Sequence, residues 1–167
     1  MHIPRRLTLL SACATLALAS CNSAGTTVDL PQAIADARII VDGVANVYTQ
    51  ITVLYPKAVS PAQQAAVAGY LSAARSALAQ LSTNADVLTN IRSLQSIEAA
   101  VNAVLAIVGG VVAGIPGVPP EVTAGILAAQ VLLPAIEMAV NQLQGQAVKA
   151  PTPAAMSVDQ ARRTLAK

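Results

Sequence analysis

The chain has 167 residues, with ten basic and eight acidic side chains, and 54% of its residues are hydrophobic. Only 11% are charged, less than half of the roughly 25% that is usual in globular proteins. Such a balance does not suggest a nucleic-acid partner, because binding one needs a basic face to neutralise phosphates. The length and the apolar content predict one domain with a substantial core.

Residues 1–20 have the three-part build of a secretory signal peptide. Arg5 and Arg6 supply the positive start, and an uncharged, mostly apolar run extends from Leu7 to Ser20. Its length of about fourteen residues suits a signal peptide and is short of the roughly 20 residues that a membrane-spanning helix needs. We therefore expect this segment to be removed.

The apolar run closes on the tetrad Leu18-Ala19-Ser20-Cys21. This tetrad resembles the lipobox of bacterial lipoproteins, which implies cleavage between Ser20 and Cys21 and acylation of Cys21. A second match ends at Cys13, but it would leave a hydrophobic region of only six residues. Cys21 is therefore the predicted lipidation site, and an ordinary signal peptide with a chance cysteine is the alternative. Two or more acyl chains anchor a protein stably to a membrane.

The resemblance also implies a location. In enteric bacteria, lipoproteins with Asp after the acylated Cys stay at the inner membrane, and here the next residue is Asn22. The expectation is an outer-membrane protein, anchored through Cys21 and facing the periplasm, with the inner membrane as the less favoured location. Removal of residues 1–20 takes away two arginines and no acid, which leaves eight basic and eight acidic residues.

The residues of the mature chain do not favour catalysis. His2, the only histidine, and Cys13 leave with the signal, and the acylated Cys21 has no free thiol. General acid–base catalysis near neutral pH relies mostly on His, and transition-metal sites on His and Cys. The carboxylates are spaced as single residues along the sequence: Asp29, Asp36, Asp42, Asp86, Glu98, Glu121, Glu137 and Asp159. We expect no enzyme, no catalytic residues, no cofactor and no metal site.

Two helices are predicted in the first half of the mature chain. Asp29 and Pro31 start the first, and an apolar stripe with steps of three and four residues carries it to about Leu54. Pro56 ends it. Ser60, followed by Pro61 and Gln63, forms a capping-box pattern that predicts a second helix ending near residue 81.

Two further long helices follow. Thr83 or Asn84 is expected to cap the third, which runs to about residue 114 with Asp86 in its first turn. The Pro-Gly-rich residues 114–120 form a turn. The fourth helix is predicted over residues 120–144, with Gly145 as its C-terminal stop and a kink at Pro134.

These elements predict an all-α fold, an antiparallel up-down four-helix bundle with a flexible C-terminal tail. The expected organisation is the signal peptide at 1–20, the lipidated Cys and tether at 21–30, and the bundle at 31–145. Residues 146–167 are expected to form a Pro-containing linker and a short terminal helix, which Ser157 caps. Arg162 and Arg163 could touch anionic lipid, but the apolar face beside them is small, so a solvated tail is preferred.

One apolar region admits a second interpretation. Between Ala99 and Val148 the only charged residues are Glu121 and Glu137, and Gly110 and Gly114 have the spacing of a membrane-helix packing motif. A membrane-active hairpin, holin-like or pore-forming, would have these features. The apolar stretches on either side of the turn fall short of about 20 residues, so the core of a soluble bundle is preferred.

Lys167 and the tyrosines are further candidates. Braun's lipoprotein of the outer membrane is likewise small, lipidated and helical, and its final Lys is joined to peptidoglycan. Residues 162–167 are similar to it in the final Lys and the nearby basic residues, which implies possible peptidoglycan attachment at Lys167. Tyr48, Tyr55 and Tyr70 could form a recognition patch, although core positions with the hydroxyl at the edge are the preferred interpretation.

The sequence therefore predicts a lipid-anchored cell-envelope protein with a non-catalytic structural or interaction role. Its expected partners are the membrane, through Cys21, and an envelope protein or peptidoglycan, with no nucleic acid. The membrane-active hairpin is the first alternative, and a peptidoglycan tether through Lys167 is the second.

Overall fold

The computed structural model describes residues 29–145 and 156–166, and every regular element within these ranges is a helix. The predicted all-α class is confirmed. The helices are α1 (Leu30–Leu54), α2 (Pro61–Gln80), α3 (Val87–Ala113), α4 (Pro120–Leu143) and α5 (Val158–Leu165).

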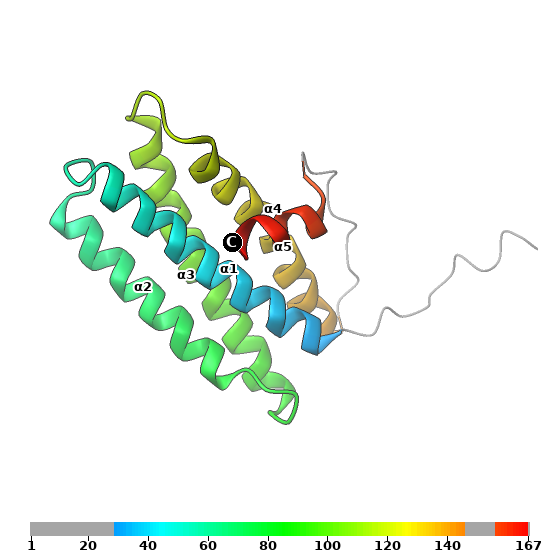
Figure 1. Cartoon of the computed structure of the whole chain (residues 1–167). Helices are drawn as coiled ribbons and strands as arrows, with labels where there is room; N and C mark the ends of the chain where they lie inside the picture. The colour runs from blue at the N-terminus through cyan, green and yellow to red at the C-terminus, as the bar shows by residue number, and fades with distance from the viewer. Residues whose placement is uncertain (1–28, 146–155, 167) are drawn as a thin grey trace, which may run out of the picture.

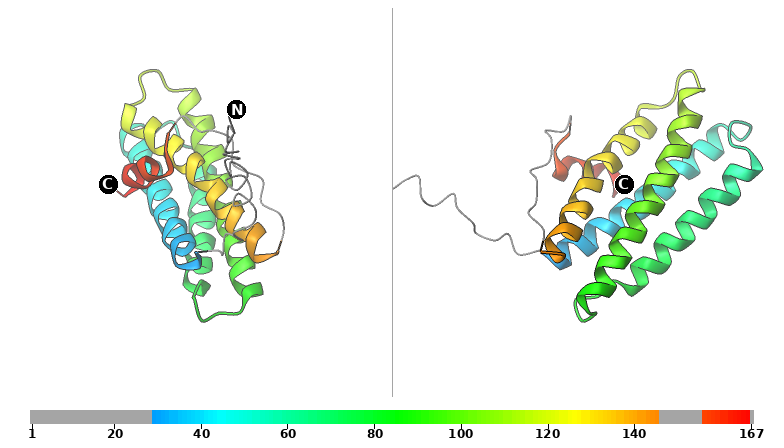
Figure 2. Two further views of the ribbon diagram at one scale, coloured as in Figure 1. Left: turned by 90° about the vertical axis from the view of Figure 1, so that its right-hand side faces the viewer. Right: turned by 180° about the vertical axis from the view of Figure 1, so that it is seen from behind.

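The four long helices lie side by side, and the short α5 lies across α1 and α4 (Figure 1). α2 packs mainly on α3, and α1 mainly on α4, whereas α1 and α2 touch over a smaller area. The start of α1, the α2–α3 turn and the end of α4 lie at one end of the body (Figure 2). The α1–α2 and α3–α4 connections lie at the opposite end.

The core consists of aliphatic side chains of modest size. Its largest fully buried members come from all the long helices except α2, and they are Ile40, Ile51, Leu94, Ile97, Leu132 and Ile136. Many of the remaining buried positions are Val and Ala, which let the helices approach closely. Most of the apolar positions at helical spacing on α1 and α3, such as Val44 and Val104, are buried. Val87 is an exception: it has the spacing of the buried face of α3, but it is 51% exposed.

The helix starts follow the capping residues. Asp29 accepts a hydrogen bond from the Gln32 backbone N–H, and Ser60 accepts one from the Gln63 N–H while the Gln63 side chain bonds back to the Ser60 N–H. The capping box predicted at Ser60 is therefore confirmed. Such caps satisfy N–H groups that have no partner within the helix.

The start of α3 differs from the prediction. Asp86 is the N-cap, with its carboxylate accepting from the Thr89 backbone N–H at 2.9 Å and from the Thr89 hydroxyl at 2.7 Å. Thr83 and Asn84 belong instead to the preceding turn. The buried Asn90 side chain holds this turn, because it accepts from the Ser82 N–H and donates to the Ser82 carbonyl.

Two glycines with positive φ shape the chain after long helices. Gly117 (φ 75°) lies in the α3–α4 loop. Its carbonyl accepts a hydrogen bond from the Tyr55 hydroxyl at 3.3 Å, and this bond joins the α3–α4 connection to the α1–α2 connection. Gly145 (φ 69°) follows α4 as the predicted stop. Pro134 lies inside α4, which continues as one helix to Leu143.

Gly109→Ala is expected to stabilise the protein by up to about 1 kcal/mol, because Ala loses less backbone entropy in a helix. A Cβ at this position of α3 would meet no other atom within 4 Å. The free energy of unfolding in urea, compared with the unchanged chain, tests this. A loss of stability would contradict the open space that surrounds Gly109.

Candidate functional site

The most elaborate polar arrangement in the described residues joins α5 to α1. The Arg162 guanidinium donates from Nε to Asp36 Oδ1 at 2.7 Å and from Nη2 to Asp36 Oδ2 at 2.8 Å. Gln32 donates to the same Asp36 Oδ1 at 2.9 Å, and Arg162 Nη1 donates to Asp159 at 3.0 Å. This two-pronged geometry is the strongest form of an Arg–carboxylate contact. Residues 126 positions apart are thereby held together.

The apolar side of α5 seats beside the same ion pair. Ala161 and Leu165 are buried, and Leu165 lies against the bare backbone of Gly43 in α1. A Cβ at Gly43 would stand 2.5 Å from Leu165 Cδ2 and 2.7 Å from Leu165 Cβ, so only glycine leaves room for this leucine. The bare backbone at Gly43 thus forms a notch in α1, and the Leu165 side chain of α5 fills this glycine notch.

The expected flexible, solvated tail is wrong for residues 158–165. These residues form the short helix that the Ser157 cap predicted, with Ser157 accepting from the Gln160 N–H, but the helix is packed rather than free. The prediction failed because it weighed only the small apolar face of α5. The sequence alone does not reveal that the buried Asp36 carboxylate of α1 pairs with Arg162, or that Gly43 leaves room for Leu165.

A cavity of about 570 Å³ opens beside the docked helix. Its polar side chains are Asn46, Thr49 and Gln50 from α1, Glu121 from α4 and Thr164 from α5. The Thr164 hydroxyl already donates to the Gln160 carbonyl. The lining offers amides and one carboxylate for hydrogen bonding, and it contains no nucleophile paired with a base.

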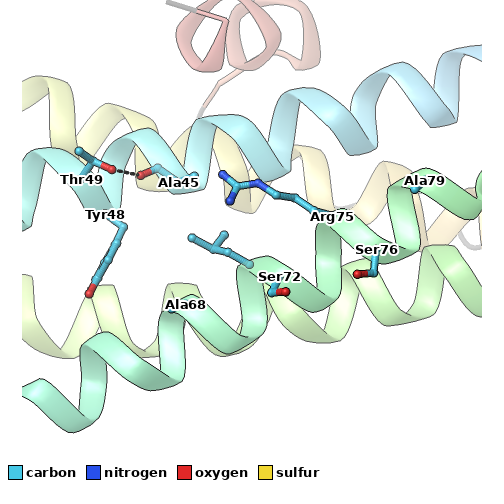
Figure 3. Close-up of a pocket in the computed structure, with 9 residues that line it drawn as sticks. Ala45, Tyr48, Thr49, Ala68, Ser72, Arg75, Ser76 and Ala79 are labelled. Atoms are coloured by element: carbon cyan, nitrogen blue, oxygen red, sulfur yellow. Dashed lines mark hydrogen bonds between the residues drawn. The ribbon is translucent and has the colours of Figure 1, made fainter.

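A second cavity, of about 630 Å³, is a groove between α1 and α2 (Figure 3). Arg75 reaches along it from α2 toward α1, while Ser72 and Ser76 lie at its α2 side. Alanines and Leu71 form much of the remaining lining. The groove lies where α1 and α2 pack over a smaller area than the other neighbouring long helices.

Two acidic residues that are 39 positions apart approach each other between α3 and α4. Burial raises the pKa of Glu98, and the charge of Glu137 raises it further. These carboxylates are single along the sequence, but the fold brings Glu98 and Glu137 near enough for their charges to interact. In the described parts of the chain, no group of three or more metal-ligating side chains converges.

Glu98→Gln is expected to stabilise the protein at pH 7 by about 0.2–0.5 kcal/mol, by analogy with a like-charge pair one turn apart on a single helix. The raised pKa means that the folded state favours the protonated form, so stability falls as pH rises from about 4.5 through the folded pKa. The gain should therefore shrink toward pH 4. Urea unfolding across this pH range measures it.

Glu121→Gln is the matched control for that prediction. Glu121 is an exposed carboxylate in the first turn of α4, where a negative charge favours the helix. Its loss should slightly destabilise the protein at pH 7, the opposite sign. Equal effects of both substitutions would contradict the proximity of Glu98 and Glu137.

The tyrosines have separate surroundings. Tyr48 packs against the core from α1, and burial raises its pKa. Tyr55 bonds to the α3–α4 loop, and Tyr70 is exposed on α2. Tyr48 is the only one that lines the groove between α1 and α2. The remaining sequence-predicted sites, Ser20, Cys21 and Lys167, lie outside the described residues.

The two apolar helices have about the lengths that the sequence predicted, and both exceed the uncharged stretches within them. α3 has 27 residues and α4 has 24, with mean hydropathies of 1.9 and 1.7 in their most apolar windows, so both are long enough to cross a bilayer. The uncharged stretch before the turn begins only at Ala99, whereas α3 begins at Val87. Of these windows, 39% and 44% of the residues are buried inside the protein. Core helices of soluble proteins have the same properties, so length does not decide between the two interpretations.

Comparison with known proteins adds no relative: no protein-family model, no curated protein and no solved structure matches this chain.

Proposed function

We propose that this chain is a lipid-anchored cell-envelope protein with a non-catalytic structural or interaction role. The tetrad Leu18-Ala19-Ser20-Cys21 carries the proposal. The start of α1 at Leu30 supports it, since a short tether after Cys21 leads directly into the folded body. By the lipoprotein sorting rule, Asn22 favours the outer membrane, with the body in the periplasm.

We further propose that α1 to α4 form an antiparallel up-down four-helix bundle. The support is the pairing of α1 with α4 and of α2 with α3, together with connections that alternate between the two ends (Figures 1 and 2). In this arrangement α5 packs on the outside of the bundle, against α1 and α4, and is not a free tail. Short turns between antiparallel neighbours are typical of this topology.

An interaction role fits the surfaces better than a reaction does. The face of α1 and α4 already binds a helix, through a glycine notch and a buried carboxylate. The groove between α1 and α2 presents the guanidinium of Arg75 above small side chains. An envelope protein or peptidoglycan is the proposed partner of such surfaces.

The anchor is tested by expressing the full chain in a Gram-negative host and measuring the mass of the membrane-bound product. The expected product starts at Cys21 and carries acyl chains. Cys21→Ser should remove the acyl mass and release the protein from the membrane. Cys13→Ser is the matched control and should change nothing. Acylation that persists in Cys21→Ser would refute the proposed site.

The second candidate function is a membrane-active hairpin formed by α3 and α4, holin-like or pore-forming. The observation that favours it is the length and hydropathy of both helices. Residues 22–167, expressed without signal and lipid, should need detergent and release dye from vesicles if it holds. A helical product of defined size that stays soluble without detergent would instead support packing of these helices on each other.

A peptidoglycan tether through Lys167 remains a third proposal, based on the sequence. Leu165 is docked at Gly43, two residues before Lys167, so attachment would join the cell wall to the side of the body. Digestion of purified cell wall should then yield a muropeptide joined to the C-terminal peptide. Lys167→Arg should abolish that product, and its absence from the unchanged protein would remove the proposal.

A further inference from the structure

One end of the body combines the entry of the chain with an exposed apolar edge. The start of α1, the α2–α3 turn and the end of α4 lie together there (Figures 1 and 2). The first two residues of α3, Val87 and Leu88, are at this end and are 51% and 63% exposed. Neither side chain contributes to the core, so this pair is available for contact with something outside the protein.

Exposure alone does not identify this edge as a contact surface. Val53 and Leu54, at the C-terminal end of α1, are also exposed, Val53 to 72%, and they lie at the opposite end of the body. What distinguishes Val87 and Leu88 is their position relative to the start of the folded chain. The occupant of the edge can therefore be argued from the tether.

The tether, even when fully extended, is shorter than the body is long. Asp29 follows Cys21 by eight residues, which span at most about 29 Å when fully extended. The 25 residues of α1 have a length of about 37 Å. If acyl chains hold Cys21 in a bilayer, the end that carries Leu30 and Leu88 stays within a tether length of the lipid. Such confinement gives a high effective concentration, so that even a weak apolar contact forms.

The charges at this edge do not select a particular lipid headgroup. Asp29 and Asp86 cap the two helices that begin at this end, and Arg92 follows on the next turns of α3; all three are exposed. These charges form no basic patch, which makes a hydrophobic contact the main attraction. The contact should therefore be insensitive to salt, unlike binding through a basic patch.

We propose that Val87 and Leu88 dip into the surface of the membrane that carries the lipid anchor. The body then stands in a fixed orientation, with the α1–α2 and α3–α4 connections directed away from that membrane. This inference rests on the proposed lipid anchoring. The placement of the α1 start and the α2–α3 turn at one end, with the other two connections at the opposite end, is seen in the structure itself. The predicted orientation also distinguishes the main proposal from the membrane-active hairpin. The hairpin would bring the α3–α4 loop to the lipid, whereas the proposed orientation directs that loop away from it.

The absence of tryptophan from the chain provides a clean test. Residues 21–167 contain every described residue and a single cysteine, so Cys21 can be coupled to a thiol-reactive lipid in phosphatidylcholine vesicles. Leu88→Trp reports on the proposed edge, and Val53→Trp, an exposed apolar position at the other end, is the matched control. The measurements are the emission maximum and quenching by brominated lipid, with circular dichroism to check that both variants fold.

For Leu88→Trp we expect a blue-shifted emission and strong quenching by brominated lipid, unchanged in 0.5 M salt, a concentration at which the Debye length is only about 4 Å. Val53→Trp should remain accessible to aqueous iodide. Equal quenching of both, quenching of neither, or deeper burial of Val53→Trp would overturn the inference. Chemical coupling makes this result independent of acylation in the cell, so failure of the edge contact and failure of the proposed anchor are distinguishable.

Discussion

Replacing Arg162 by alanine is expected to release α5 while the four long helices stay folded. Two of the hydrogen bonds that the guanidinium makes are to Asp36, whose side chain is only 4% exposed. Removing one partner of a buried ion pair costs about 3–5 kcal/mol, because the remaining charge is uncompensated. The lower end applies here, since the Arg162 side chain is 28% exposed.

The loss in overall stability should be smaller than this local cost. α5 has eight residues and buries only Ala161 and Leu165 from its apolar side, so it can detach as a unit. Detachment lets water reach Asp36, which limits the penalty to the free energy that docking had contributed. A clear loss of α5 with a modest change in the unfolding midpoint is the expected signature.

Hydrogen exchange followed by mass spectrometry measures this directly. Amides in α5 should lose protection by about 100-fold, which corresponds to roughly 3 kcal/mol, while amides in α3 keep theirs. Arg163→Ala is the matched control, because Arg163 is the adjacent, exposed arginine and has no ion pair among those found in the described residues. Equal losses in both variants would show that the ion pair does not hold α5.

The long helices could be predicted because each is specified locally. Apolar spacing sets their faces, and Ser60 with Gln63, the Pro-Gly loop and Gly145 set most of their ends. Asp86 was misjudged as a first-turn residue because Thr83 and Asn84 are equally good caps on local rules. Only the turn held by Asn90 decides among them.

The docking of α5 could not be predicted, because it depends on residues that are far apart in sequence. From the sequence alone, Asp36 resembles an ordinary surface residue of α1. Gly43 resembles a glycine that merely weakens the helix. Their roles appear only when Arg162 and Leu165 are brought to them. The approach of Glu98 to Glu137 was missed for the same reason. The tetrad that resembles a lipobox differs, since it is a linear pattern whose prediction needs no knowledge of the fold.

Gly125→Ala is expected to destabilise the protein by about 1–3 kcal/mol, although the same substitution usually favours a helix by about 1 kcal/mol. Gly125 is buried in α4 at its contact with α1, and a Cβ there would collide with Val47 Cγ2. Valine in a helix has one strongly preferred side-chain rotamer, so this methyl group cannot turn away at low cost. The two helices would have to separate, at the interface that also supports α5.

A double-mutant cycle tests whether this close approach is the cause. Val47→Ala alone removes buried methyl groups and should destabilise the protein, but combined with Gly125→Ala it makes room for the new Cβ. The double variant should therefore be more stable than the sum of the single effects predicts, as measured by urea unfolding. Gly109→Ala is the control for helix propensity, because its Cβ meets nothing within 4 Å. If Gly125→Ala were as stabilising as Gly109→Ala, the close contact between α1 and α4 at Val47 and Gly125 would be contradicted.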